Sequence, residues 1–264
     1  MENYQNSQPA MKTVTGFGII LKSLIGIIIV FAVAMPRILA GEILFQGLMG
    51  LLLVVVLGIL WFVVFRSLMV DKGPIVNLIV YMFACFLLGL FFSNTIAVSI
   101  YYISFYANGA VDAQLISQAL TLAAFATMVA VVGGIIVLPR IKLTGKVARI
   151  GLNLMPIFSA ILIGYGILYF IAFILALFGA TGLLNALMGL VFGIGNLSIG
   201  LSVIAVLFAE ALFLASAARV KMMIGTEPKY LEYYGAVIIV NAVIQIFVEI
   251  FKLVLKILAR RNQN

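Results

Sequence analysis

Histidine is absent from the sequence, and Cys85 is the only cysteine. A disulfide within the chain is therefore excluded, and a thiol-redox pair or a zinc site of the usual ligand types is not expected. Asp71 and Asp112 are the only aspartates, and both are predicted to lie in loops. No histidine is present to activate a serine, and neither an HExxH pattern nor a phosphate-binding loop occurs. We therefore expect no enzyme activity and no cofactor, and these residues identify no certain metal site.

Charged residues are scarce as well. They make up 9% of the 264 residues, whereas 66% are hydrophobic. Soluble domains carry about 25% charged residues and roughly 45–50% apolar ones. A water-soluble fold has no means of covering this much apolar surface, so the composition predicts a protein embedded in the lipid bilayer. The net charge of +8 then reflects basic loops that face the anionic cytoplasmic leaflet, not a nucleic-acid partner.

Apolar runs long enough to cross a bilayer recur along the chain. One crossing takes about 20 apolar residues in a helix. The sequence predicts an all-α fold with seven spans, near residues 19–40, 43–65, 75–103, 113–138, 154–178, 186–216 and 234–256. These spans make up a single transmembrane domain over residues 19–258. A polar tail (1–18) precedes it, and a short basic tail (259–264) follows it.

Lysines and arginines outside the apolar runs predict the orientation. If seven spans alternate, eleven basic residues fall on the side of the N-terminus and five on the other side. The positive-inside rule then places the N-terminus in the cytoplasm. The basic tail with Arg260 and Arg261 is carried to the opposite side, which its charge does not favour. A re-entrant last helix is the alternative that this conflict leaves open.

The seventh span carries polar residues at helical spacing. Intervals of four, four, three and four residues place five of them on one stripe of a helix: Asn241, Gln245, Glu249, Lys252 and Lys256. A charge at the bilayer centre costs at least about 2.5–3.5 kcal/mol. The stripe is therefore expected to face protein or water. For Glu249 an interfacial pair with Lys252 is an equal alternative.

The other members of the stripe have simpler expected roles. Lys252 and Lys256 are expected to lie at the interface and to snorkel. Asn241 and Gln245 are expected to form hydrogen bonds between helices. Lys22, at the start of the first span, is expected to be an interfacial anchor.

Glu210 is a second acid within an apolar run, and no basic residue lies within four positions of it. Its partner must come from another helix, or the acid is protonated, hydrated or metal-bound. Two neighbouring buried acids would share a proton, so Glu210 and Glu249 are predicted to form a titrating pair. The candidates for an ion pathway or for pH sensing are Glu210, Glu249, Asn241, Gln245 and Lys252.

Small residues precede Glu210 along the chain. Gly189 and Gly193 form a small-xxx-small pair, and further small residues follow at Gly195, Ser198, Gly200 and Ser202. Such residues let membrane helices approach closely. They are expected to shape the packing and indicate nothing about a substrate.

Two segments near the C-terminus carry a more specific pattern. Residues 225–236 form a turn with Gly, Pro and Lys followed by acids and aromatics, and residues 247–255 form a closing apolar run with Glu249 and Lys252. In these segments the chain resembles the Bax inhibitor-1 family, particularly its bacterial YccA-like branch. Weaker likeness extends to residues 115–120 and 141–149. Glu232, Glu249 and Lys252 fall where that pattern has acid, acid and base.

The resemblance implies a multi-pass protein of the bacterial plasma membrane, with seven helices and the last one at the centre. It also implies a pH-sensitive cation leak, for calcium or protons, governed by an acidic pair on the last two helices. This chain departs from the pattern there, because Ala215 and Ser216 stand where relatives carry acids, and Glu210 is the nearest acid. The alternative function is a non-transporting regulator that binds another membrane protein, such as a quality-control protease.

Overall fold

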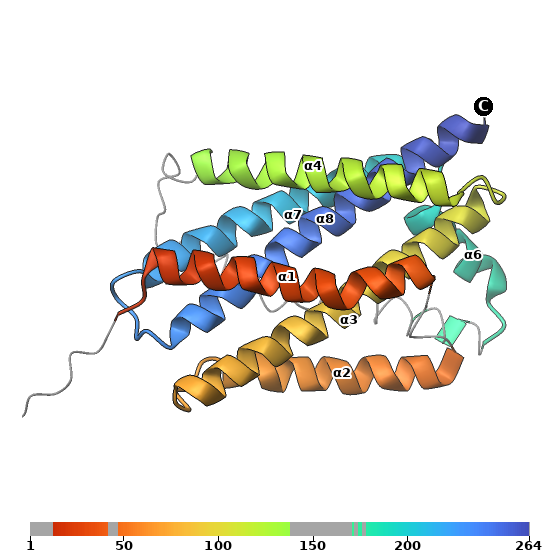
Figure 1. Cartoon of the computed structure of the whole chain (residues 1–264). Coiled ribbons are helices and arrows are strands. Elements are labelled where there is room, and N and C mark those ends of the chain that lie inside the picture. The colour runs from red at the N-terminus through yellow and green to blue at the C-terminus, as the bar shows by residue number, and fades with distance from the viewer. Residues whose placement is uncertain (1–12, 42–46, 138–170, 172–173, 176–177, 264) are drawn as a thin grey trace, which may run out of the picture.

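A computed structural model describes residues 13–41, 47–137, 171, 174–175 and 178–263 of the chain. This part is all-α and forms a bundle of long helices (Figure 1). Within it there are seven helices: α1 (Gly16–Ala40), α2 (Gly47–Ser67), α3 (Pro74–Tyr106), α4 (Ala113–Val137), α6 (Thr181–Phe192), α7 (Asn196–Met223) and α8 (Leu231–Gln263). Five of them are long and apolar enough to cross a membrane, namely α1, α3, α4, α7 and α8.

Most of the predicted spans correspond to helices. The first four coincide with α1 to α4 to within about four residues at each end, the accuracy expected of such boundaries. The fifth, 154–178, lies mostly outside the described residues, as does the basic segment 141–149. The sixth prediction corresponds to α7, but its bounds are wrong, because residues 186–192 belong to a separate helix, α6.

Two glycines mark the break between α6 and α7. Gly193 ends α6 with extended backbone, and its N–H donates to the carbonyl of Gly189 at 2.9 Å. Gly195 precedes α7, also with extended backbone. Most residues on both sides are apolar, so hydropathy stays high across the break. This is why the sequence pattern predicts one continuous span.

α8 runs through the middle of the bundle and packs against α1, α3, α4 and α7 (Figure 1). Of its most apolar stretch 67% is buried, against 22–50% for the other four long helices. Its 33 residues form one unbroken helix, about 50 Å long at 1.5 Å per residue. The expected central position is therefore confirmed, and an unbroken helix of this length favours a single crossing over the re-entrant alternative.

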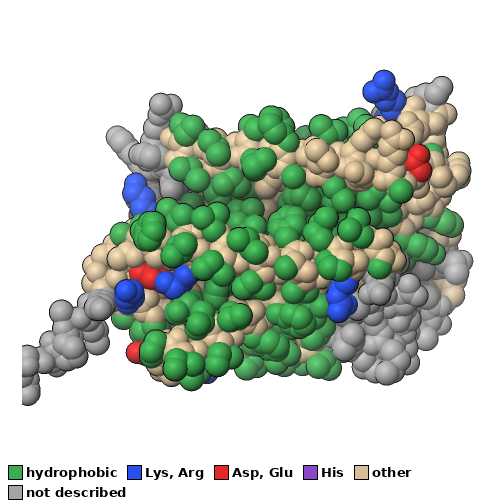
Figure 2. Space-filling view, viewed as in Figure 1, with side chains coloured by type: hydrophobic (Ala, Val, Ile, Leu, Met, Phe, Trp, Pro, Cys, Tyr) green, Lys and Arg blue, Asp and Glu red, His purple; other side chains and the backbone are tan. Residues whose placement is uncertain are grey.

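Apolar side chains cover the face of the bundle between its ends, and charged side chains gather toward the ends (Figure 2). Ile28 on α1, Phe125 on α4 and Leu207 on α7 are 63–67% exposed. In water such a surface would be unfavourable, whereas the hydrocarbon core of a bilayer requires it. The arrangement is that of a protein whose helices cross a membrane.

Glycines allow α1 to approach its neighbours closely. A Cβ atom added at Gly26 would lie 2.5 Å from the Tyr81 hydroxyl of α3 and 2.9 Å from a methyl of Val240 on α8. At Gly89 of α3, an added Cβ would lie 2.8 Å from Val33 of α1. At both glycines the helices are therefore closer together than a residue larger than glycine would permit.

We expect Gly26→Ala to destabilise the protein although alanine favours helices. Relief of the contacts requires the buried Tyr81 and Val240 side chains, or the helices that carry them, to shift, which costs about 1–3 kcal/mol and outweighs the gain of about 1 kcal/mol from helix propensity. Gly58→Ala on α2 is the control, because no atom of the described residues lies within 4 Å of its added Cβ. Thermal unfolding in detergent should rank Gly26→Ala below the parent and Gly58→Ala at or above it. Equal stability of the two variants would contradict the close crossing.

Candidate functional site

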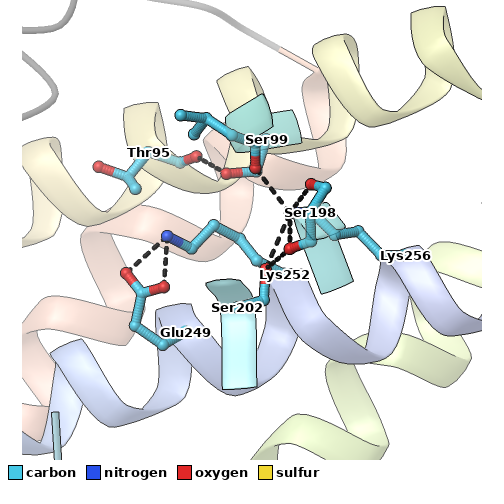
Figure 3. A network of polar contacts seen from close by, with 8 residues as sticks. Thr95, Ser99, Ser198, Ser202, Glu249, Lys252 and Lys256 are labelled. Atoms are coloured by element: carbon cyan, nitrogen blue, oxygen red, sulfur yellow. Dashed lines mark hydrogen bonds and ion pairs between the residues drawn. The ribbon is translucent and has the colours of Figure 1, made fainter. Parts of the chain in front are cut away.

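The polar stripe of α8 faces the interior of the bundle. All five of its residues are buried or half-buried: Asn241, Gln245, Glu249, Lys252 and Lys256. Lys252 is 7% exposed and Lys256 is 1% exposed. The expectation that these two lysines snorkel to the interface is therefore wrong, because protein atoms bind both ammonium groups (Figure 3).

Lys256 binds the break between α6 and α7. Its Nζ donates to the Val191 carbonyl at 2.6 Å and to the hydroxyls of Ser198 and Ser202, both at 2.8 Å. The Ser198 carbonyl lies 3.3 Å from the same nitrogen. An ammonium has three N–H donors, so these four neutral oxygens satisfy it fully.

The local structure explains why these oxygens converge. Val191 lies in the last turn of α6, where carbonyls lack amide partners within the helix and the helix dipole favours a cation. Ser198 and Ser202 are four residues apart in the first turns of α7 and so share one face. Ser202 donates its own proton to the Ser198 carbonyl at 3.1 Å, which leaves its lone pairs free for Lys256.

Glu249 and Lys252 form an ion pair one helical turn before Lys256 (Figure 3). The oxygen and nitrogen are 2.5 Å apart, and the side chains are only 14% and 8% exposed. The predicted local pairing is thus confirmed, but the pair is buried in the bundle. Both residues are charged neighbours of Lys256. With all three ionised, the cluster carries one net positive charge.

Arg260 extends the same pattern by one further turn. Its guanidinium donates to the side-chain oxygen of Asn196, the first residue of α7. Lys256 and Arg260 therefore both bind the beginning of α7. The basic end of α8 thus holds helices together.

Glu210 and Asn241 each carry a buried oxygen that no hydrogen bond reaches within the described part of the chain. Glu210 faces α4, since a Cβ added at Gly134 would lie 3.1 Å from its Oε1. Glu249 is paired with Lys252, and no hydrogen bond reaches Glu210 Oε2 among the described residues. The titrating pair of Glu210 and Glu249 thus stays a prediction.

A second buried ion pair lies at the opposite end of α8. Glu232, 1% exposed, contacts the Lys22 ammonium at 2.5 Å and accepts the N–H and O–H of Thr15 at 2.9 and 2.8 Å. Thr15 also caps α1, and Lys22 lies 4.8 Å from the ring centre of Tyr233. Lys22 is therefore more than the expected interfacial anchor, because it fastens the beginning of α1 to the beginning of α8.

Sequence reasoning missed the roles of Ser198, Ser202 and Lys256. The expectation that the small residues of this segment serve close helix approach finds no support at Gly195 and Gly200, where no atom of the described residues lies within 4 Å of an added Cβ. A signal was present, because two serines at helical spacing follow a pair of glycines directly. The sequence did not indicate the partner of these serines, Lys256, because it lies 54 or more positions farther along the chain.

No group of three or more His, Cys, Asp or Glu side chains that could hold a metal ion occurs in the described ranges. Comparisons with protein-family models, with curated proteins and with solved structures found no match to this chain. The fold and the apolar surface by themselves establish a multi-pass integral membrane protein with a polar, charged interior along its last helix.

Proposed function

We propose that the protein is a Bax-inhibitor-like membrane protein that passes protons or cations through its helix bundle in a pH-sensitive way. The observation that carries this proposal is the buried Glu249–Lys252 pair, which lies beside Lys256 inside the bundle. Ionisable residues inside membrane helices are costly and commonly mark pathways for ions or protons. Packing alone would be served as well by apolar residues at these positions.

The Glu249–Lys252 pair is the proposed gate. While it is closed, each charge neutralises the other at 2.5 Å. A proton that reaches Glu249 removes its negative charge and so weakens its attraction for the Lys252 ammonium. Because Lys252 and Lys256 outnumber Glu249, the closed cluster repels divalent cations. The proton is therefore favoured over calcium as the ion that passes.

Protein reconstituted into liposomes tests this proposal. We expect proton flux through the parent to rise as the pH falls, and Glu249→Gln to conduct at neutral pH as the parent does in acid, about tenfold faster, which corresponds to roughly 1.4 kcal/mol in the barrier. Glu210→Gln should alter the pH profile if Glu210 belongs to the path. Glu227→Gln is the matched control, since its carboxylate lies outside the stripe, 3.8 Å from Arg219.

A non-transporting regulator is the second candidate, and the saturated surroundings of Lys256 favour it. Fully satisfied polar networks rigidify a structure, as a scaffold for another membrane protein requires. Under this alternative, liposomes with the parent protein leak no faster than protein-free liposomes at any pH. That result would overturn the proposed conduction.

A further inference from the structure

The surroundings of the Lys256 ammonium consist of neutral oxygens. Two are backbone carbonyls, of Val191 and Ser198, and two are hydroxyls, of Ser198 and Ser202, at 2.6–3.3 Å. Among the described residues no carboxylate forms a salt bridge with Lys256, although the side chain is 1% exposed. A buried lysine held in this way is unusual, because buried charges are commonly paired with opposite charges.

Carbonyl and hydroxyl oxygens are also the ligands that hard metal cations prefer. In membrane transport proteins, the ends of broken helices and unwound backbone carbonyls provide such oxygens for small monovalent cations. The break between α6 and α7 has this form, with a carbonyl from the end of one helix and hydroxyls from the beginning of the next. The oxygens are brought together by the backbone and by a pair of serines, not by a carboxylate.

We propose that the break between α6 and α7 is a monovalent-cation site, and that Lys256 occupies it as a cation tethered to α8. The site suits a single positive charge, because all four oxygens are neutral and the neighbouring Glu249–Lys252 pair adds no net charge. This inference goes beyond the proposed function, since a tethered cation can hold the helices together whether or not any ion crosses the bundle.

Removal of the tether tests the site. Lys256→Ala leaves the four oxygens and a vacated volume, whereas Lys256→Met fills the volume and supplies no charge. Thermal unfolding of both variants and the parent is measured in choline chloride and in lithium, sodium and potassium chloride at equal ionic strength. We expect the melting temperature of Lys256→Ala to be several degrees higher in at least one alkali chloride than in choline chloride. The parent and Lys256→Met should not respond, and adding Ser202→Ala to Lys256→Ala should abolish the response.

Each other outcome is decisive. Equal alkali responses of Lys256→Ala and Lys256→Met would show a general salt effect and overturn the site, as would no response of Lys256→Ala. If Lys256→Ala fails to fold in choline, the site predicts recovery in an alkali chloride, and failure to recover in all three contradicts it. None of these results depends on liposome flux, so this inference and the proposed function can fail separately.

Discussion

Lys256→Met should lower the stability of the protein more than any substitution of an exposed basic residue. The change removes the ammonium that donates hydrogen bonds to oxygens of Val191, Ser198 and Ser202. Because the site is buried, no water can take the place of this donor. Buried acceptors left without a partner cost about 1–3 kcal/mol each, and relaxation of the serines recovers part of this. We expect a total loss of about 2–4 kcal/mol, because the same bonds join α8 to both α6 and α7.

Thermal unfolding in detergent measures this loss. Arg261→Met is the matched control, because it makes a similar change on the same helix at an exposed position. Its free energy of unfolding should equal that of the parent to within about 0.5 kcal/mol. Equal effects of the two substitutions would mean that Lys256 is a solvated residue, and the described site would be wrong.

Glu232→Gln, at the other end of α8, should lower the stability of the protein nearly as much. Glutamine keeps the shape but removes the charge that faces Lys22, and it cannot serve both Lys22 and Thr15 as the carboxylate does. Removal of one partner from a buried ion pair costs about 3–5 kcal/mol. Because Lys22 is 19% exposed, we expect the lower end of this range.

A double-mutant cycle separates the ion pair from general packing. Lys22→Met and Glu232→Gln should each destabilise the protein, whereas the double variant should be more stable than the sum of the single losses predicts. Glu227→Gln serves as the exposed control, since its pair with Arg219 spans 3.8 Å and both side chains are more than a quarter exposed. Additive losses in the cycle would show that Lys22 and Glu232 do not interact.

Much of the architecture could be predicted from the sequence because it follows from hydropathy. The first four spans and the central, polar last helix correspond to α1–α4 and α8. Composition and run length decide such features locally. The break at residues 193–195 could not be predicted in this way, because glycine between apolar residues changes the backbone without lowering hydropathy.

Only the part of the candidate site that lies on α8 could be predicted from the sequence. The spacing along α8 placed Glu249, Lys252 and Lys256 on one stripe, but it did not indicate which helix each one meets. The partners of Lys256 lie 54–65 positions away, and Lys22 and Glu232 are 210 positions apart. A single sequence contains no record of such long-range contacts. Without these contacts, the sequence favoured an interfacial position for Lys256, because snorkelling is the usual state of a lysine near the end of a span. This expectation was wrong.

The central claim is that α8 crosses the membrane once, through the middle of the bundle, and it can be tested with single cysteines at its two ends. Lys229 and Asn262 are both exposed, and the native Cys85 is fully buried, so labelling of the parent should be low. With the N-terminus in the cytoplasm, Asn262→Cys should react with an impermeant maleimide in intact cells, and Lys229→Cys only after permeabilisation. Labelling of both positions from the same side would contradict a membrane-crossing α8.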